Sequence, residues 1–240
     1  MNILFIHGNY PAQFRSLATD LGRQSAHNVK FLTARKDPDK FPIQGIDVIT
    51  YEESTCKIDT DEAQHSIIHD QISRGKLIQE KIKELIEQNF IPQLIFFHGG
   101  NGLGIFLKPM LPSCTIIGYF EWYFSKLCAN LILNRSDQDS YNFIRSRNIT
   151  MESEILDCDA CVVPTQWQAS QFPEKLQPYL SIIFDGIDFD FFKPATDEIN
   201  TKPHYIEGED NSLSIEPSDL LLTYATRGME PMRGFPEFIS

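Results

Sequence analysis

The amino-acid sequence predicts an α/β fold: a mainly parallel, Rossmann-like sheet with helices on both faces. Short apolar runs alternate along the chain with stretches in which apolar residues recur at helical spacing. The order of these runs shows no hairpin signal. Because buried parallel strands are continuously apolar and need crossover connections, this order indicates repeated strand-helix-strand units.

The first 98 residues carry four apolar runs and two helical stretches. The runs, which predict strands, are residues 2–7, 29–33, 46–51 and 92–98. Residues 12–21 have apolar side chains at helical spacing, and Pro11 suits the first turn of that helix, where its missing N–H group costs nothing. Residues 59–89 carry a broad apolar stripe and predict one long helix or two, with N-cap candidates at residues 59–61.

The same pattern continues to residue 194. Residues 99–104 form a loop with enough glycine for the backbone to lie against a ligand, and a helix is predicted over about 103–110. A helical pattern covers 137–156, and Thr165 is a suitable N-cap for the helix that follows it. The remaining predicted strands are residues 115–120, 160–163 and 181–184. We expect the last of these, which runs into an Asp-Gly turn, to end the sheet.

The composition changes after residue 194. Residues 195–219 hold seven acidic residues and one basic residue, which predicts an acidic linker or an exposed excursion. The apolar run 220–226 predicts a fresh buried strand outside the first sheet. We therefore predict a Rossmann-like domain over 1–194, the acidic linker over 195–219 and the truncated start of a second domain over 220–240.

Charge and cysteine content disfavour several classes of protein. The 240 residues contain 21 Lys and Arg against 33 Asp and Glu, a formal net charge of −12, which disfavours sequence-independent binding to nucleic acid or anionic lipid. The sequence shows no signal peptide and no transmembrane run, which predicts a cytoplasmic protein and leaves peripheral membrane association open. Five cysteines, an odd number, fit free thiols in a reducing compartment.

Polar residues follow three of the predicted strands. His7 ends the first strand and is followed by Gly8 and Asn9, His98 ends the fourth strand, and Glu121 follows the fifth. The carboxyl ends of parallel strands meet at one edge of the sheet, where open α/β sheets bind ligands. There a carboxylate beside aromatic side chains can act as an acid, a base or an acceptor for sugar hydroxyls. The alternatives are that Glu121 caps a helix or pairs with a Lys or Arg, and that His98 is a hydrogen-bonded residue of the sheet rim.

Three other kinds of site are disfavoured. The His-Gly-Gly segment at 98–100 is similar to the oxyanion loop of esterases, but a serine hydrolase of that kind also needs a downstream Gly-x-Ser-x-Gly, which is absent from the sequence. The glycine spacing of the dinucleotide-binding fingerprint is absent as well. The Cys-x-x-Cys segment at Cys158 and the histidine pair that begins at His65 lack further ligands, so we predict no metal site.

Two arginines flank a glycine-containing loop near the end of the chain. Arg227 and Arg233 lie between a predicted strand and a predicted helix. Guanidinium groups together with the N–H groups of a helix start make a good diphosphate site. The alternative interpretation, a pair of surface arginines, is equally supported by the residues alone.

Several segments together resemble a known enzyme family. Residues 185–188 (DGID) and 192–194 (FKP) resemble the N-G-V-D and F-x-P signature of the retaining family 4 glycosyltransferases, which have the GT-B fold. Residues 162–168 (VVPTQWQ) occupy the place of the preceding strand and helix. A bacterial subgroup of that family is similar over further segments, namely residues 7–14, 98–112, 118–123, 164–173 and 224–238.

The resemblance implies a sugar transferase with two Rossmann-like domains that face a crevice. The N-terminal domain would hold the acceptor, and the C-terminal domain would hold the nucleotide-sugar donor. Arg227 and Arg233 match the basic pair that holds the donor diphosphate in place of a metal, and Gly8 matches a loop that faces the donor phosphates. Glu121 lies where many relatives carry a histidine near the reacting sugar, which implies contact with the transition state or a sugar hydroxyl.

His98 is the second catalytic candidate.

The chain departs from the subgroup in one loop. The subgroup tends to carry Trp and Glu there, where this chain has Asn101 and Leu103. The Glu-x7-Glu region that binds the donor in the subgroup would lie beyond Ser240. The candidates for the acceptor side of the crevice are Asn9, Gly100, Asn101, Asp185 and Gly186.

The expected reaction moves a sugar from a nucleotide-diphosphate sugar to a hydroxyl group of a carbohydrate or lipid-linked acceptor. It proceeds with retention and needs no metal or other cofactor. The 240 residues alone are expected to show little or no turnover. The alternative is a non-catalytic module that binds a carbohydrate or a protein partner in the same glycine-rich crevice.

Overall fold

The computed structural model describes residues 1–53, 63–126, 128, 137–194, 203–207, 212–220, 222–226, 228–229 and 231–240. The chain forms two compact units, Met1–Asp185 and Gly186–Ser240. The domain boundaries predicted at residues 194 and 219 stay predictions.

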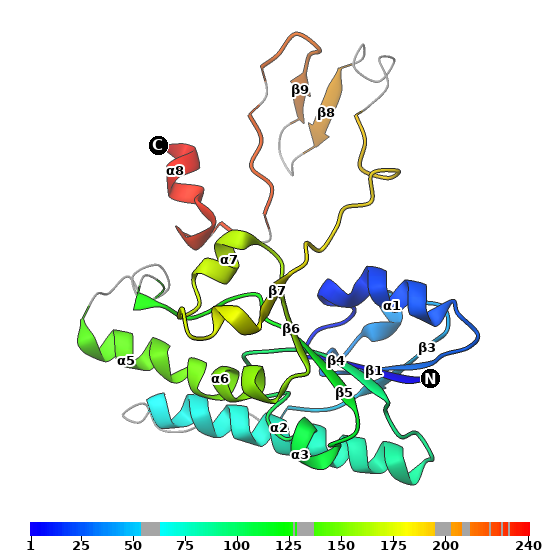
Figure 1. Ribbon diagram of the computed structural model, residues 1–240. Coiled ribbons are helices and arrows are strands. Elements are labelled where there is room, and N and C mark those ends of the chain that lie inside the picture. The colour runs from blue at the N-terminus through cyan, green and yellow to red at the C-terminus, as the bar shows by residue number, and fades with distance from the viewer. Residues whose placement is uncertain are drawn as a thin grey trace. The chain divides into compact units, whose positions relative to one another are not determined.

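The first unit is organised around a seven-stranded sheet in the order β3-β2-β1-β4-β5-β6-β7 (Figure 1). Every neighbouring pair of strands is parallel. The strands are β1 (Asn2–His7), β2 (Asn28–Thr33), β3 (Ile46–Thr50), β4 (Leu94–His98), β5 (Thr115–Tyr119), β6 (Ala160–Val163) and β7 (Leu180–Ile182). Each corresponds to a predicted apolar run, so the Rossmann-like parallel sheet is confirmed, and β7 ends it.

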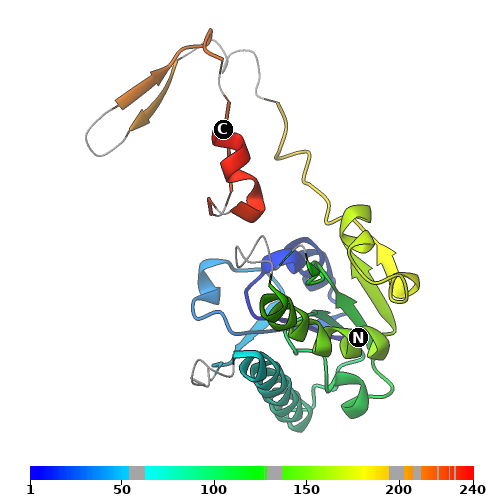
Figure 2. The same cartoon turned by 90° about the vertical axis from the view of Figure 1, so that its left-hand side faces the viewer.

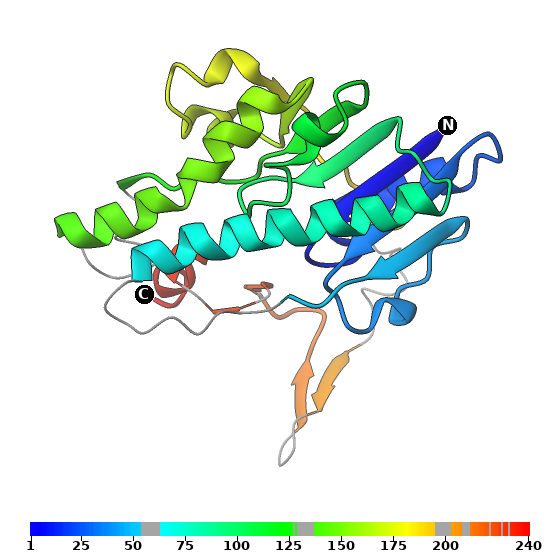
Figure 3. The same cartoon turned by 90° about the horizontal axis from the view of Figure 1, so that it is seen from below.

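Helices cover both faces of the sheet. Leu4 and Ile6 of β1 join the core that contains Ile78 of α2, whereas Phe5 points to the other face and packs with Phe14 in front of α1. Figure 3 shows α2 running beside α5 and α6. The helical elements are η1 (Ala12–Phe14), α1 (Arg15–Gly22), η2 (Pro38–Lys40), α2 (Ala63–Glu87), α3 (Leu107–Met110), α5 (Gln138–Ser146), α6 (Asn148–Asp157), α7 (Gln166–Ser170) and η4 (Gln177–Tyr179).

Polar side chains fix the first residues of α7 and α6. Thr165 caps α7 as predicted, because its hydroxyl oxygen accepts a hydrogen bond from the backbone N–H of Gln168 at 3.1 Å. The helical stretch predicted over 137–156 is divided into α5 and α6. At the start of α6 the buried amide of Asn148 bonds to both the N–H and the carbonyl of Phe124, which anchors α6. The N-cap candidates at residues 59–61 lie outside the described residues.

A buried carboxylate holds the glycine loop that follows β4. Glu154 of α6 is 0% exposed and accepts hydrogen bonds from the backbone N–H groups of Gly100 at 2.7 Å and Gly104 at 2.8 Å. Burial raises the pKa of Glu154 to about 7, and the backbone hydrogen bonds oppose that rise. The hydrogen bonds of Glu154 hold residues 100–104 as a loop. The helix predicted from residue 103 therefore begins only at Leu107.

The second unit contains a hairpin and a short helix. β8 (His204–Glu207) pairs with β9 (Ser212–Ile215) in an antiparallel sheet (Figure 2). Further along the chain, η5 (Pro231–Arg233) leads into α8 (Phe235–Ile239). Part of the segment predicted as a linker or exposed excursion therefore forms a hairpin.

The strand predicted over residues 220–226 is wrong for its described part. Leu220 and Leu222 are 93% and 79% exposed, and the described residues of this segment pair with no strand. An apolar run becomes a strand only when another strand satisfies its backbone groups. Tyr224 packs instead against Phe238 of α8, with ring centroids 5.1 Å apart. The expectation that this segment lies outside the first sheet is confirmed.

We predict that Glu154→Ala destabilises the protein by about 3 kcal/mol, because buried N–H groups lose their acceptor and a cavity forms. Urea unfolding of the purified protein measures this. Glu87→Ala, at an exposed position of α2, is the matched control and is expected to stay within about 0.5 kcal/mol of the wild type. Equal losses in the two variants would contradict the role assigned to Glu154.

The difference in stability between the wild type and Glu154→Ala is also expected to depend on pH. The folded-state pKa of Glu154, about 7, lies above the ordinary value of 4.5, so the folded protein binds the proton more tightly than the unfolded chain. The stability of the wild type relative to Glu154→Ala is therefore expected to fall as the pH rises from 4.5 to 7. A difference that grows over this interval in unfolding curves would show that the carboxylate is preferentially ionised in the fold.

Candidate functional site

Two histidines meet at the carboxyl edge of the sheet. β1 pairs with β2 on one side and with β4 on the other, so the strand order reverses between β1 and β4. At such a reversal the connections leave on opposite faces and a crevice opens beyond the strand ends. His7 ends β1, His98 ends β4, and their ring centroids lie 4.5 Å apart. The fold therefore places both rings where open α/β sheets bind ligands.

Glu121 joins the two histidines from the adjacent strand. It follows the end of β5, and its Oε2 atom lies 3.4 Å from Nε2 of His98. The same oxygen accepts a hydrogen bond from Nε2 of Gln13 at 2.8 Å. The hydrogen bond from His98 lowers the pKa of Glu121 although partial burial opposes it, so the carboxylate is ionised at neutral pH. Its side chain is 43% exposed and can meet a ligand.

A chain of hydrogen bonds orients the carboxylate of Glu121. The backbone N–H of Asn9 donates to Nδ1 of His7 at 2.8 Å, so the neutral ring carries its proton on Nε2. That nitrogen lies 2.9 Å from Oε1 of Gln13, whose amide N–H then bonds to Glu121. Burial, with a smaller contribution from His98, lowers the pKa of His7 to about 4. His7 is therefore neutral under ordinary conditions.

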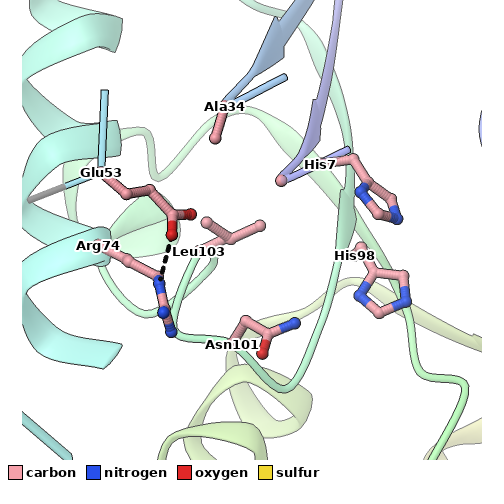
Figure 4. Close-up of a pocket in the computed structure, with 8 residues that line it drawn as sticks. His7, Ala34, Glu53, Arg74, His98, Asn101 and Leu103 are labelled. Carbon is pink, nitrogen blue, oxygen red and sulfur yellow. Dashed lines mark hydrogen bonds and ion pairs between the residues drawn. The ribbon is translucent and has the colours of Figure 1, made fainter. Parts of the chain in front are cut away.

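A cavity of about 290 Å³ opens beside these side chains (Figure 4). Figure 4 shows His7 and His98 on one side and an ion pair on the other, in which Nε of Arg74 lies 3.2 Å from Oε2 of Glu53. Asn101 projects from the glycine loop between the two sides. The lining residues are His7, Gly8, Ala34, Glu53, Arg74, His98, Asn101 and Leu103.

The sequence interpretation missed several of these residues. Glu53 follows β3 closely, so the strand-end argument that found Glu121 could have found it. Gln13 lies in the first turn after the β1 loop, where its polar side chain was the only signal. Arg74 sits in the middle of α2 and has no local signal, because only the packing of that helix on the glycine loop brings it to the cavity.

Tight packing sets the course of the glycine loop. Gly102 has a φ of 82°, and a Cβ atom there would lie 2.2 Å from the carbonyl oxygen of Gln71 on α2. Only glycine fits such a position. Of the predicted crevice residues in this loop, Asn101 lines the main cavity, and Gly100 borders a smaller cavity next to it.

Two other predicted site residues have different surroundings. Oδ1 of Asn9 accepts a hydrogen bond from the guanidinium of Arg35 at 2.9 Å. The carboxylate of Asp185 accepts hydrogen bonds from the hydroxyl of Tyr119 at 2.9 and 3.0 Å. Burial, together with this hydrogen bond, raises the pKa of Tyr119. Asp185 borders a separate, largely apolar cavity of about 380 Å³ near Phe14.

The remaining predicted residues lie beyond the first unit. Gly186 belongs to the second unit and has a φ of 79°, as the turn prediction requires. Arg233 is also in the second unit, where its carbonyl accepts a hydrogen bond from the hydroxyl of Tyr224 at 2.9 Å. Arg227 lies outside the described residues. The assignment of both arginines to a donor diphosphate stays a prediction.

The described ranges contain neither a cluster of metal-ligand side chains nor a helix suited to span a membrane. There, no three or more His, Cys, Asp and Glu side chains gather in a way that could hold a metal ion. No described helix has both the length and the apolar character that a membrane span requires. Four of the cysteines, Cys114, Cys128, Cys158 and Cys161, are free thiols.

The chain is similar to solved structures of glycosyltransferases. A single-residue variant of Os79 from O. sativa in complex with UDP has a TM-score of 0.51 at 7% identity, with 83% of this chain and 57% of that chain covered. A UDP-glucosyltransferase from Polygonum tinctorium has a TM-score of 0.50 at 10% identity, with 82% and 55% covered. At these identities the likeness shows the fold alone, that of a Rossmann-like domain of GT-B glycosyltransferases. No match was found among curated proteins.

The chain spans about half the length of the solved structures that it matches. A family model described as glycosyl transferase family 4 group matches residues 25–192, which is more than half of the chain. The matched segment includes the strands from β2 to β7, and with them His98 and Glu121. The chain therefore belongs to the glycosyl transferase family 4 group.

Proposed function

We propose that the protein transfers a sugar from a nucleotide-diphosphate sugar to a hydroxyl group of a carbohydrate or lipid-linked acceptor. The observation that carries this proposal is the contact of His98 with Glu121 beside a cavity of about 290 Å³, near the lower end of the range for small-molecule sites. Family membership supports sugar transfer, and the UDP-bound structural relatives support a nucleotide-linked donor. In this proposal the first unit holds the acceptor.

The proposed reaction forms a bond from the acceptor oxygen to the anomeric carbon and breaks the bond from that carbon to the diphosphate. The acceptor hydroxyl must also lose a proton. Glu121 is a weak base because its pKa is lowered, so we assign that proton to the departing diphosphate, which gains negative charge. Glu121 then orients the acceptor hydroxyl and stabilises positive charge on the sugar ring.

This assignment leaves one oxygen of Glu121 for the substrate. Oε2 is occupied by Gln13 and His98, whereas no described residue bonds to Oε1. The acceptor oxygen would attack the sugar from the face that the diphosphate leaves, with no covalent intermediate on the protein. Such a reaction retains the anomeric configuration. The negative charge of the diphosphate would be met by Arg227 and Arg233, with Gly8 near the phosphates and without a metal ion.

The second candidate function is a non-catalytic carbohydrate- or partner-binding module. The observation that favours it is Leu103 in the cavity wall, where the resembling subgroup tends to carry a polar residue. A screen of nucleotide sugars against the full-length protein decides between the two. A binding module gives no turnover with any donor, whereas a transferase releases a nucleoside diphosphate.

We predict that Glu121→Gln lowers kcat of the full-length enzyme by about 10²-fold, with a much smaller change in the acceptor KM. The substitution keeps the shape of the side chain and removes the charge that acts in the transition state. Steady-state release of nucleoside diphosphate measures both constants.

Glu174→Gln, at an exposed position of the first unit, is the matched control and should leave kcat unchanged. If both variants turn over at the wild-type rate, Glu121 has no part in the reaction. If only the acceptor KM of Glu121→Gln rises, its role is restricted to binding.

We also predict that the folded protein loses stability in acid, because His7, which belongs to the hydrogen-bond chain to Glu121, is neutral in the fold. The folded-state pKa of His7, about 4, lies below the ordinary value of 6.5, so the unfolded chain takes up a proton that the folded protein does not. As the pH falls from 6.5 to 4, the wild type should lose up to about 3 kcal/mol relative to His7→Asn. Urea unfolding at several pH values measures this, with His69→Asn on exposed α2 surface as the control. A difference that favours the wild type in acid would contradict the neutral state assigned to His7.

A further inference from the structure

A second, smaller cavity adjoins the one beside His98. Its volume is about 160 Å³, and it shares Arg74 and Asn101 with the larger cavity. The rest of its wall includes Gln71 of α2, Gly100 of the glycine loop, and Arg147, which joins α5 to α6. A ligand that fills both cavities would extend from Arg147 to the two histidines.

The guanidinium group of Arg147 has no anionic partner among the described residues. No carboxylate of the described ranges lies within ion-pair distance of it, and its Nε atom is buried without a hydrogen-bond partner. It stands 5.0 Å from the centre of the Phe124 ring. Burial and the nearby charge of Arg74 both lower the pKa of Arg147. Among the described residues, this partly desolvated positive charge is therefore met by the face of an aromatic ring and by no carboxylate.

The charged side chains nearest the small cavity, Arg74 and Asp70, do not pair with Arg147. Arg74 pairs with Glu53 through its Nε atom, and no described residue forms a hydrogen bond or an ion pair with its terminal nitrogens. Figure 4 shows that end of Arg74 near Asn101, away from Glu53. Asp70 also borders the small cavity, but its side chain lies 4.0 Å from Nδ1 of His69 and forms no ion pair with either arginine. Within the described ranges, no anion therefore bridges the two guanidinium groups.

The protein positions Arg147 through its backbone. Nε2 of Gln71, which is 3% exposed, donates to the carbonyl of Arg147 at 3.1 Å and to that of Gly100 at 3.3 Å. One buried amide thus ties the arginine segment and the glycine loop to α2. Such an arrangement keeps the guanidinium at the cavity and limits its rearrangement when a ligand binds.

We propose that this small cavity binds a phosphate group of the acceptor substrate. Two guanidinium forks suit a phosphate dianion, and the amide of Asn101 adds a neutral donor. The inference rests on the proposed function, because it makes the bound molecule an acceptor whose hydroxyl lies towards His98 and Glu121. The phosphate is either that of a soluble sugar phosphate or that of a lipid headgroup, since the recognised chemistry is the same.

Binding of inorganic phosphate to the protein tests this without any donor or turnover. Inorganic phosphate is titrated into the protein in a calorimeter, with chloride used to keep the ionic strength constant. We expect saturable binding with a Kd in the millimolar range. Arg147→Met keeps the apolar stem of the side chain and should weaken phosphate binding at least ten-fold. Arg23→Met, which removes an exposed surface arginine, should leave it unchanged. Circular dichroism checks that both variants fold, and Arg74→Met provides a second variant of the site.

Two further arms distinguish the sources of the phosphate. Glucose 6-phosphate represents a soluble acceptor, and vesicles that contain phosphatidic acid represent a headgroup. Binding in either arm that Arg147→Met weakens supports the proposal and identifies the source. The proposal is overturned if phosphate does not bind, or if Arg147→Met and Arg23→Met bind it equally. Since these measurements need no donor, a wrong reaction assignment would fail in the turnover screen and leave the phosphate result intact.

Discussion

The candidate site depends on the parallel pairing of β1 with β4. Their register sets Ile6 opposite Phe97, so the strands end level with each other and the rings of His7 and His98 meet. Strand pairing then continues outward in both directions from this point, which makes it the place where the order reverses. A slip of one residue would turn one ring to the opposite face of the sheet. The register is secured by the apolar residues of both strands, which face cores on both sides.

Buried polar side chains convert the glycine loop into a fixed wall. Outside helices and strands, backbone N–H and carbonyl groups still need partners when they are buried. Glu154 accepts from the loop N–H groups, and Gln71 donates to the carbonyl of Gly100. The loop that carries Asn101 is thereby held between α2 and α6. Such preorganisation lowers the entropic cost of ligand binding.

The local charge of the site differs from that of the whole chain. The sequence has a net charge of −12, yet Arg74 and Arg147 border one small cavity and two histidines border the next. Net charge reports on long-range attraction and says nothing about a few buried groups. An acidic protein can therefore recognise an anion, provided that the fold brings cations from distant parts of the sequence into one place.

The sequence by itself determined the order of the strands in the first unit, because apolar periodicity is a local property of the chain. It also determined the family resemblance and the strand-end candidates His98 and Glu121, since parallel strands deliver their ends to a common edge. Only the tertiary structure decided their partners. Arg74 and Arg147 reach the site because α2 and the junction of α5 with α6 pack beside the glycine loop, which no local pattern encodes. Gln13 follows β1 closely, and only the fold sets it against Glu121. For the same reason the apolar run 220–226 was wrongly predicted as a strand: a strand forms only where a neighbour pairs with it.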